Sequence, residues 1–237
     1  MNHALPLDNA HPEETPHRSE QWGAGAALLA IAFGMGGLAL ERPWPAGGDA
    51  FTAFLAQNRG AIVGQSLFFM VGSAINLWFL GSLRSYLARA EGGGAPLTHV
   101  AFGSGVLWVG LNIVGQAPQI VLTLPTQAAL DPALARVLAD LCFVMLNTAN
   151  LPLAVMFGAI AVVALKARAF PVWLGVLAAV AGVAALALTF AVAQASGPLA
   201  PQGWLTLALY PSSVIWLLPA PIVMMRRIGR ALAVAHR

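Results

Sequence analysis

The segment DLCFVMLNTANLPLAVMFGAI (140–160) is apolar enough to lie in a lipid bilayer, yet it contains an aspartate, two asparagines, a threonine and a proline. A run of about 20 mostly apolar residues is the length that a helix needs to cross the hydrocarbon core. Lipid offers no hydrogen-bond partner to polar side chains. The segment therefore predicts a membrane-crossing helix with one side turned toward other protein.

Composition extends this prediction to the whole chain. Hydrophobic residues make up 59% of the 237 residues and charged residues only 9%, against roughly 25% in ordinary soluble domains. Uncharged runs predict six spans, at 22–40, 61–83, 99–124, 138–165, 170–195 and 203–225. We expect an all-α polytopic membrane protein, with a flexible N-terminal tail (1–20), a six-helix transmembrane domain (21–228) and a basic C-terminal tail (229–237).

Basic residues are unevenly distributed between the two sides of the predicted bundle. Nine arginines and lysines lie in the terminal tails or after even-numbered spans, and three lie after odd-numbered spans. Because cytoplasmic loops carry such an excess, both termini are predicted to be cytoplasmic. Trp22 and Trp173 then lie at the inner interface and Trp44 and Trp204 at the outer one, where indole rings are enriched.

Two connections on the predicted outer side contain sequences that predict local structure. Asp131 followed by Pro132 predicts a helix start, with an N-cap acceptor and a proline in the first turn. The segment AFTAFLAQ (50–57) is predicted to lie flat in the headgroup region.

Polar side chains share one face in each of three predicted helices, because their spacing keeps them within a narrow arc at about 100° per residue. Turned toward one another, the three faces form a polar interior that lipid does not contact. The residues are Gln65 in the second span, Asn112, Gln116 and Gln119 in the third, and Asp140, Asn147 and Asn150 in the fourth.

Two interpretations of this interior are open. In the first, the amides bond neighbouring helices to one another, at about 0.6 kcal/mol per bond. In the second, they line a pocket for a small molecule or ion, with Asp140 as the proton- or cation-linked group. Arg136 precedes Asp140 by one helical turn, so an ion pair at the headgroup level explains the aspartate equally well.

Prolines predict breaks in three spans. Pro152 lacks a backbone donor and should kink the fourth span beside Asn150. The same effect is expected in the third and sixth spans at Pro118, Pro211, Pro219 and Pro221.

Small residues in the fifth span predict a close helix contact. Gly175, Ala179 and Gly182 have small-xxx-small spacing, which favours packing against a helix of the same chain or of a second copy. The expected partners are the lipid bilayer and either other membrane subunits or a second copy through this stripe. Nucleic acid is not an expected partner, because the basic residues form no clustered face.

The sequence lacks the residues that common cofactors and catalytic sites of membrane proteins require. His99 is the only histidine at a span, so a bis-histidine haem is not expected. Cys142 is the only cysteine, and no phosphate-binding glycine loop with lysine occurs. We therefore expect no cofactor, no metal and no catalytic residue. The leading hypothesis is a non-catalytic accessory or structural subunit of a membrane assembly, and the alternative is a small-molecule or ion binder or transporter.

Two segments resemble a known family. LRSYLARAEGGGAPLTHVAFGSGVL (83–107) and LPLAVMFGAIAVVALKARAFPVWLGVLAAVAGV (151–183) are similar to segments of a widespread family of six-span bacterial membrane proteins catalogued as a domain of unknown function. The resemblance implies a six-helix bundle in a bacterial cytoplasmic (inner) membrane. It implies no catalytic residue.

Overall fold

The computed structural model describes residues 16–45, 49–124, 131–194, 196–200 and 203–235. All regular secondary structure in these ranges is helical. The helices are α1 (Pro16–Ala39), α2 (Asp49–Glu91), α3 (Pro96–Gly115), α4 (Ala117–Val121), α5 (Pro132–Thr148), α6 (Asn150–Lys166), α7 (Val172–Thr189), η2 (Phe190–Ala193), α8 (Trp204–Leu209), α9 (Pro211–Leu217) and α10 (Pro219–Ala235).

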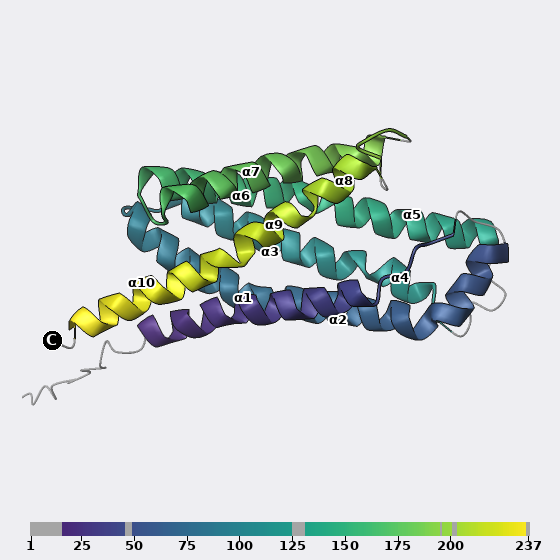
Figure 1. Ribbon diagram of the computed structural model, residues 1–237, viewed down its shortest axis with the longest axis horizontal. Coiled ribbons are helices and arrows are strands. Elements are labelled where there is room, and N and C mark those ends of the chain that lie inside the picture. The colour runs from purple at the N-terminus through teal and green to yellow at the C-terminus, as the bar shows by residue number, and fades with distance from the viewer. Residues whose placement is uncertain (1–15, 46–48, 125–130, 195, 201–202, 236–237) are drawn as a thin grey trace, which may run out of the picture.

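Six helical stretches are long and apolar enough to cross a membrane, and they correspond to the six predicted spans. Their bounds are Glu20–Ala39, Ala50–Glu91, Pro96–Val121, Pro132–Lys166, Val172–Ala193 and Trp204–Arg230. The all-helical fold with six apolar helices is thereby confirmed. The beginning of α1 and the end of α10 lie at the same end of the elongated molecule (Figure 1).

The helices form a layered bundle with α3 in the middle. α1 and α2 lie along one side and α6 and α7 along the other (Figure 1). A Cβ atom on Gly105 of α3 would lie 2.8 Å from Leu80 Cδ2 of α2 and 2.9 Å from Met156 Sδ of α6. The sixth span crosses the bundle, because α9 contacts α7 and α10 contacts α1.

α2 begins before the predicted second span, which starts at 61. It is one helix of 43 residues that includes the segment 50–57, and the position of this segment in the headgroups stays a prediction. Phe51 and Leu55 are buried in a small cluster with Leu122 and Ala135. The apolar side chains of this segment have found partners in α5 and in the end of the third span, so the helix continues without a break.

The boundaries of the described helices also differ from those of the predicted tails. α1 begins at Pro16, inside the predicted N-terminal tail, and α10 continues to Ala235, beyond the predicted boundary at 228. Residues 1–15 lie outside the described residues. The predicted helix start at 131 is confirmed, because Asp131 Oδ1 accepts a hydrogen bond of 2.7 Å from the backbone N–H of Ala133.

Close contacts at glycines pack the helices within each side of the bundle. In α1, a Cβ atom on Gly23 would lie 1.7 Å from Ser82 Oγ of α2. In α7, a Cβ atom on Gly175 would lie 2.8 Å from Leu165 Cδ2, and one on Gly182 would lie 3.4 Å from the carbonyl oxygen of Ala154. The glycines of the predicted stripe thus face α6 of the same chain.

Ala179, the third residue of that stripe, lies beside this contact and is partly buried. The stripe therefore serves as a packing face within the chain. Pairing of two copies through it stays a prediction.

Candidate functional site

Three of the six spans are interrupted beside prolines. The third span breaks at Gln116, between α3 and α4, and the fourth breaks at Ala149, between α5 and α6. The sixth breaks at Tyr210 and again at Leu218, on either side of α9. Each break lies one to three residues before a proline, which has no N–H to continue the helical bonding. The predicted breaks at Pro118, Pro152, Pro211 and Pro219 are confirmed, whereas Pro221 lies within the first turn of α10 and makes no separate break.

The first two of these breaks lie next to one another. A Cβ atom on Gly115, the last residue of α3, would lie 2.8 Å from Leu146 Cδ2, close to the end of α5. The Tyr210 hydroxyl donates a hydrogen bond of 3.2 Å to Asn147 Oδ1. The breaks of the third and fourth spans therefore lie side by side, and the Tyr210 side chain of the sixth span reaches Asn147 beside them. We call this region, with Gln116, Asn147, Asn150 and Tyr210, the break layer.

A chain of buried hydrogen bonds joins three helices near the break layer. Gln119 Nε2 of α4 donates to Gln65 Oε1 of α2 at 2.9 Å. The Cys142 thiol of α5 donates to Gln119 Oε1 at 3.6 Å, which is within range for sulfur. All three side chains are buried. These contacts are the interhelical bonds that the first interpretation of the polar interior expects.

Two predicted site residues bond within their own helix. Asn112 Nδ2 donates to the carbonyl oxygen of Trp108 at 2.8 Å, and Asn147 Nδ2 donates to that of Phe143 at 3.0 Å. Asn147 is buried, whereas Asn112 is half-buried. Of the two, only Asn147 also bonds another helix, through Tyr210.

Asp140 lies apart from the amides. Its side chain is 61% exposed and pairs with Arg136, whose Nε lies 3.2 Å from Asp140 Oδ1 one helical turn away. The structure thus shows the ion pair that the spacing of these two residues suggested. It does not bring the carboxylate together with Gln65, Gln119 or Asn147.

Gln116 and Asn150 complete the predicted set, and each retains a buried polar atom. Gln116 Oε1 and Asn150 Nδ2 have no hydrogen-bond partner among the described residues, as is also true of Ser66 Oγ and Thr206 Oγ1. Buried polar groups in proteins nearly always have a partner, either protein or ordered water. One acceptor and one donor in the break layer therefore remain able to bond a small polar molecule.

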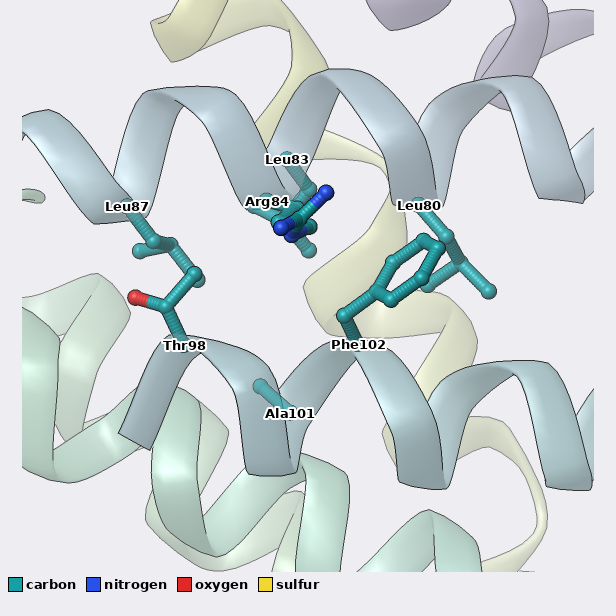
Figure 2. A pocket seen from close by; sticks show the side chains of 7 residues that line it. All are labelled: Leu80, Leu83, Arg84, Leu87, Thr98, Ala101 and Phe102. Carbon is teal, nitrogen blue, oxygen red and sulfur yellow. The ribbon is translucent and has the colours of Figure 1, made fainter. Parts of the chain in front are cut away.

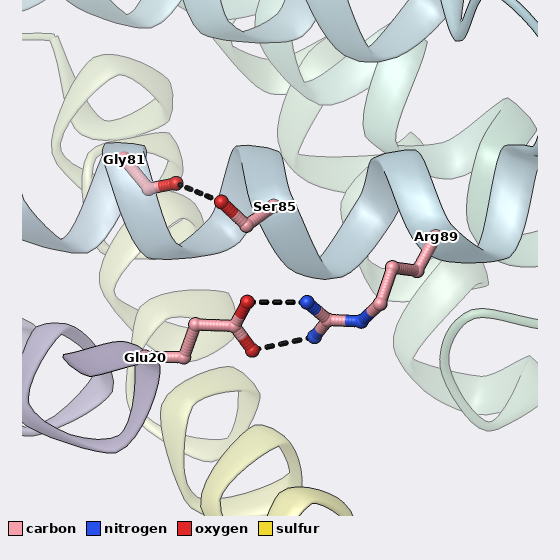
Figure 3. A network of polar contacts seen from close by, with 4 residues as sticks. All are labelled: Glu20, Gly81, Ser85 and Arg89. Carbon is pink, nitrogen blue, oxygen red and sulfur yellow. Dashed lines mark hydrogen bonds and ion pairs between the residues drawn. The ribbon is translucent and has the colours of Figure 1, made fainter. Parts of the chain in front are cut away.

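A second polar region, which sequence reasoning missed, lies where α1 begins and α10 ends. We call it the arginine end. Glu20 of α1 is buried, and its carboxylate accepts two hydrogen bonds from the guanidinium of Arg89 on α2 (Figure 3). The sequence placed Glu20 in a flexible tail, so its helical register and its partner could not be recognised.

Hydrogen bonds at the arginine end also join α2, the α6–α7 connection and α10. The Tyr86 hydroxyl donates to the carbonyl oxygen of Ala169 at 2.6 Å, and Arg227 Nη1 donates to the same oxygen at 2.6 Å. The rings of Tyr86 and Phe170 lie 5.0 Å apart between centroids. Three segments that are distant in sequence are fixed to one another here.

A small hollow between α2 and α3 is lined by Leu80, Leu83, Arg84, Leu87, Thr98, Ala101 and Phe102 (Figure 2). Its volume of about 10 Å³ has room for at most about one water molecule. The guanidinium of Arg84 lies 5.4 Å from the centroid of the Phe102 ring. This hollow belongs to the packing of the two helices.

Known proteins and metal-ligand clusters give no further residue of the site. Neither a family model, nor a curated protein, nor a solved structure matches this chain. Within the ranges that the structure describes, no three His, Cys, Asp or Glu side chains lie close enough to hold a metal ion. The resemblance carried by 83–107 and 151–183 stays a prediction.

Proposed function

We propose that the chain is a non-catalytic multi-pass protein of a bacterial inner membrane that acts as an accessory or structural subunit of a membrane assembly. Its arginine end faces the cytoplasm in this proposal. The excess of basic residues at that end supports the orientation. Large apolar side chains on the outside of the bundle support the membrane, among them Trp22, Trp78, Trp173 and Trp204, which are all more than half exposed.

The observation that carries the structural role is the bonded chain Gln65–Gln119–Cys142. Its members come from α2, α4 and α5, and all are buried. Interhelical amide bonds of this kind stabilise membrane bundles by about 0.6 kcal/mol each. Of the polar side chains that first suggested a pocket, Gln65, Gln119 and Asn147 bond another helix.

Copurification tests the role in an assembly. The full chain, expressed at native level and extracted in a mild detergent, should migrate as a complex larger than one copy in its detergent micelle. A monodisperse, solitary monomer under the same conditions would contradict the proposal. A variant with Gln65→Leu and Gln119→Leu serves as a matched control, because it should weaken the bundle itself and leave an outer docking face unaltered.

A second candidate function is the binding of a small, uncharged polar molecule in the break layer, for storage or transport. The buried, unpartnered Gln116 Oε1 and Asn150 Nδ2 favour it, and interrupted helices flanked by amides occur at transporter binding sites. Asp140 has no part in this version, because it is exposed and pairs with Arg136.

Replacing the two unpartnered amides distinguishes the structural role from the binding of a small polar molecule. Gln116→Leu and Asn150→Leu remove groups that bond nothing in the described chain, so a purely structural role predicts an unchanged or raised Tm. A bound polar molecule predicts the reverse, a lower Tm in native membranes together with loss of a copurifying compound detected by mass spectrometry. Asn112→Leu is the control, since Asn112 bonds only its own helix.

A further inference from the structure

The arginine end contains a hollow with a volume of about 300 Å³. Its lining comes from three places in the fold: α2, the α6–α7 connection and α10. Among the residues that the structure describes, no acidic residue lines it, and Glu20 of α1 pairs with Arg89. The hollow therefore carries the charge of two further guanidinium groups. The lining residues are Tyr86, Arg89, Ala90, Arg168, Ala169, Arg227 and Ile228.

Arg227 is fixed at this hollow through one of its nitrogens. Nη1 donates to the carbonyl oxygens of Ala169 at 2.6 Å and Arg168 at 3.3 Å, and it lies 3.5 Å from the Tyr86 hydroxyl. Nε and Nη2 make no hydrogen bond within the described part of the chain. Since a guanidinium has five N–H donors in a rigid plane, Arg227 is positioned and still has donors to offer.

Arg168 has an unusual backbone at this hollow. Its φ is 54°, at the position after the C-cap of α6, where glycine is the usual residue because it tolerates the left-handed conformation. The Arg168 side chain is exposed and makes no hydrogen bond with the described residues. The Arg168 guanidinium therefore keeps its N–H donors available at this hollow.

We propose that this hollow binds a phosphate group between the guanidinium groups of Arg168 and Arg227. Guanidinium groups bond phosphate oxygens in pairs, with both geometry and charge matched. The hollow lies at the end of the apolar helices, and Ala90 and Ile228 give it apolar walls. Basic pockets in this position between membrane helices bind lipid head groups. The phosphate comes from a lipid head group or from free phosphate.

The test measures the Tm of the full chain in nanodiscs, since a ligand that binds the folded state raises Tm with its concentration. One arm adds phosphatidylglycerol to nanodiscs made of a phosphate-free galactolipid. The other adds inorganic phosphate to the same phosphate-free nanodiscs. We expect Tm to rise in one arm, and the arm that responds identifies the source.

Arg168→Gly should weaken the response about tenfold in apparent affinity, the loss expected when a pair of charge-assisted bonds is removed. Glycine suits φ 54°, so Tm without phosphate should not fall. The matched control is Arg226→Gln, which removes the same charge from an exposed residue of α10 that does not line the hollow. Its apparent affinity should stay within about twofold of the native chain.

Two results would overturn the proposal: an unchanged Tm of the native chain in both arms, or equal weakening by Arg168→Gly and Arg226→Gln, which would show only a diffuse positive field. Should Arg168→Gly fail to fold, Arg168→Gln gives the same comparison with Arg226→Gln. This inference does not depend on the proposed function, because the hollow and the break layer share no residue.

Discussion

The arginine end and the break layer are both polar regions that join distant helices, but they use different chemistry. At the arginine end, the charged pair Glu20–Arg89 and the bonds from Arg227 to backbone carbonyls join the segments. In and beside the break layer, amides, a phenol and a thiol do so. Burying a charge costs far more than burying an amide. The charged pair therefore lies where one of its partners reaches the surface. The Arg89 side chain is 46% exposed.

The largest expected effect comes from removing one member of the charged pair. Arg89→Ala leaves the buried Glu20 carboxylate without its partner, and we expect the free energy of unfolding to fall by about 3 kcal/mol. Unfolding in mixed detergent micelles measures it. Arg84→Ala is the control, because Arg84 is exposed and, among the described residues, bonds His99 and lies over the Phe102 ring without an acidic partner. An equal fall in the free energy of unfolding in both variants would show that the Glu20–Arg89 pair contributes no more than an exposed arginine.

A smaller loss is expected at the tyrosine of the break layer. Tyr210→Phe leaves the buried Asn147 Oδ1 without its donor, which should lower the free energy of unfolding by about 1 kcal/mol. Tyr86→Phe at the arginine end should cost less, because the Ala169 carbonyl still accepts a bond from Arg227. Thermal unfolding of both variants in one detergent gives the comparison. The reverse ranking would show that the break layer admits water.

The coupling between Gln65 and Gln119 should be smaller still. A double-mutant cycle with Gln65→Leu and Gln119→Leu is expected to give about 0.6 kcal/mol, the average for hydrogen bonds between membrane helices. The same cycle with Gln65→Leu and Asn112→Leu should give a coupling near zero, since Asn112 bonds Trp108 of its own helix. A zero value for both cycles would mean that the amides do not fasten α2 to α4.

The smallest effect is expected at Asp140. Asp140→Asn breaks an exposed pair with Arg136, and such pairs within one helix contribute less than about 0.5 kcal/mol. The variant should be as stable as the native chain by thermal unfolding. A loss of 2 kcal/mol or more would place the carboxylate inside the bundle and restore it to the polar interior.

Much of the fold follows from the sequence because lipid imposes strong patterns. Uncharged runs located the six spans, and prolines located the breaks at 116, 149 and 210. The extension of α2 through 50–57 could not be predicted, because an amphipathic segment lies equally well on headgroups or on protein. Here Phe51 and Leu55 found partners in the distant Leu122 and Ala135.

The candidate site was predicted less completely. Spacing on a helix correctly grouped Gln65, Gln119 and Asn147 as inward side chains, because periodicity is a local property. Asp140 shares that face by periodicity, yet its helix continues toward an exposed end where Arg136 pairs with it. The arginine end was missed because its contacts join residues more than 50 positions apart, such as Glu20 with Arg89, and no local pattern records them.

Cysteine labelling in intact cells shows whether the six helices cross a bilayer with the arginine end inside. Single cysteines are introduced as Glu41→Cys, after α1, and Gly94→Cys, between α2 and α3, in a Cys142→Ser background. Both positions are exposed. A membrane-impermeant maleimide should label Glu41→Cys at once and Gly94→Cys only after the membrane is opened. Equal labelling of both in intact cells, or the reverse order, would contradict the account.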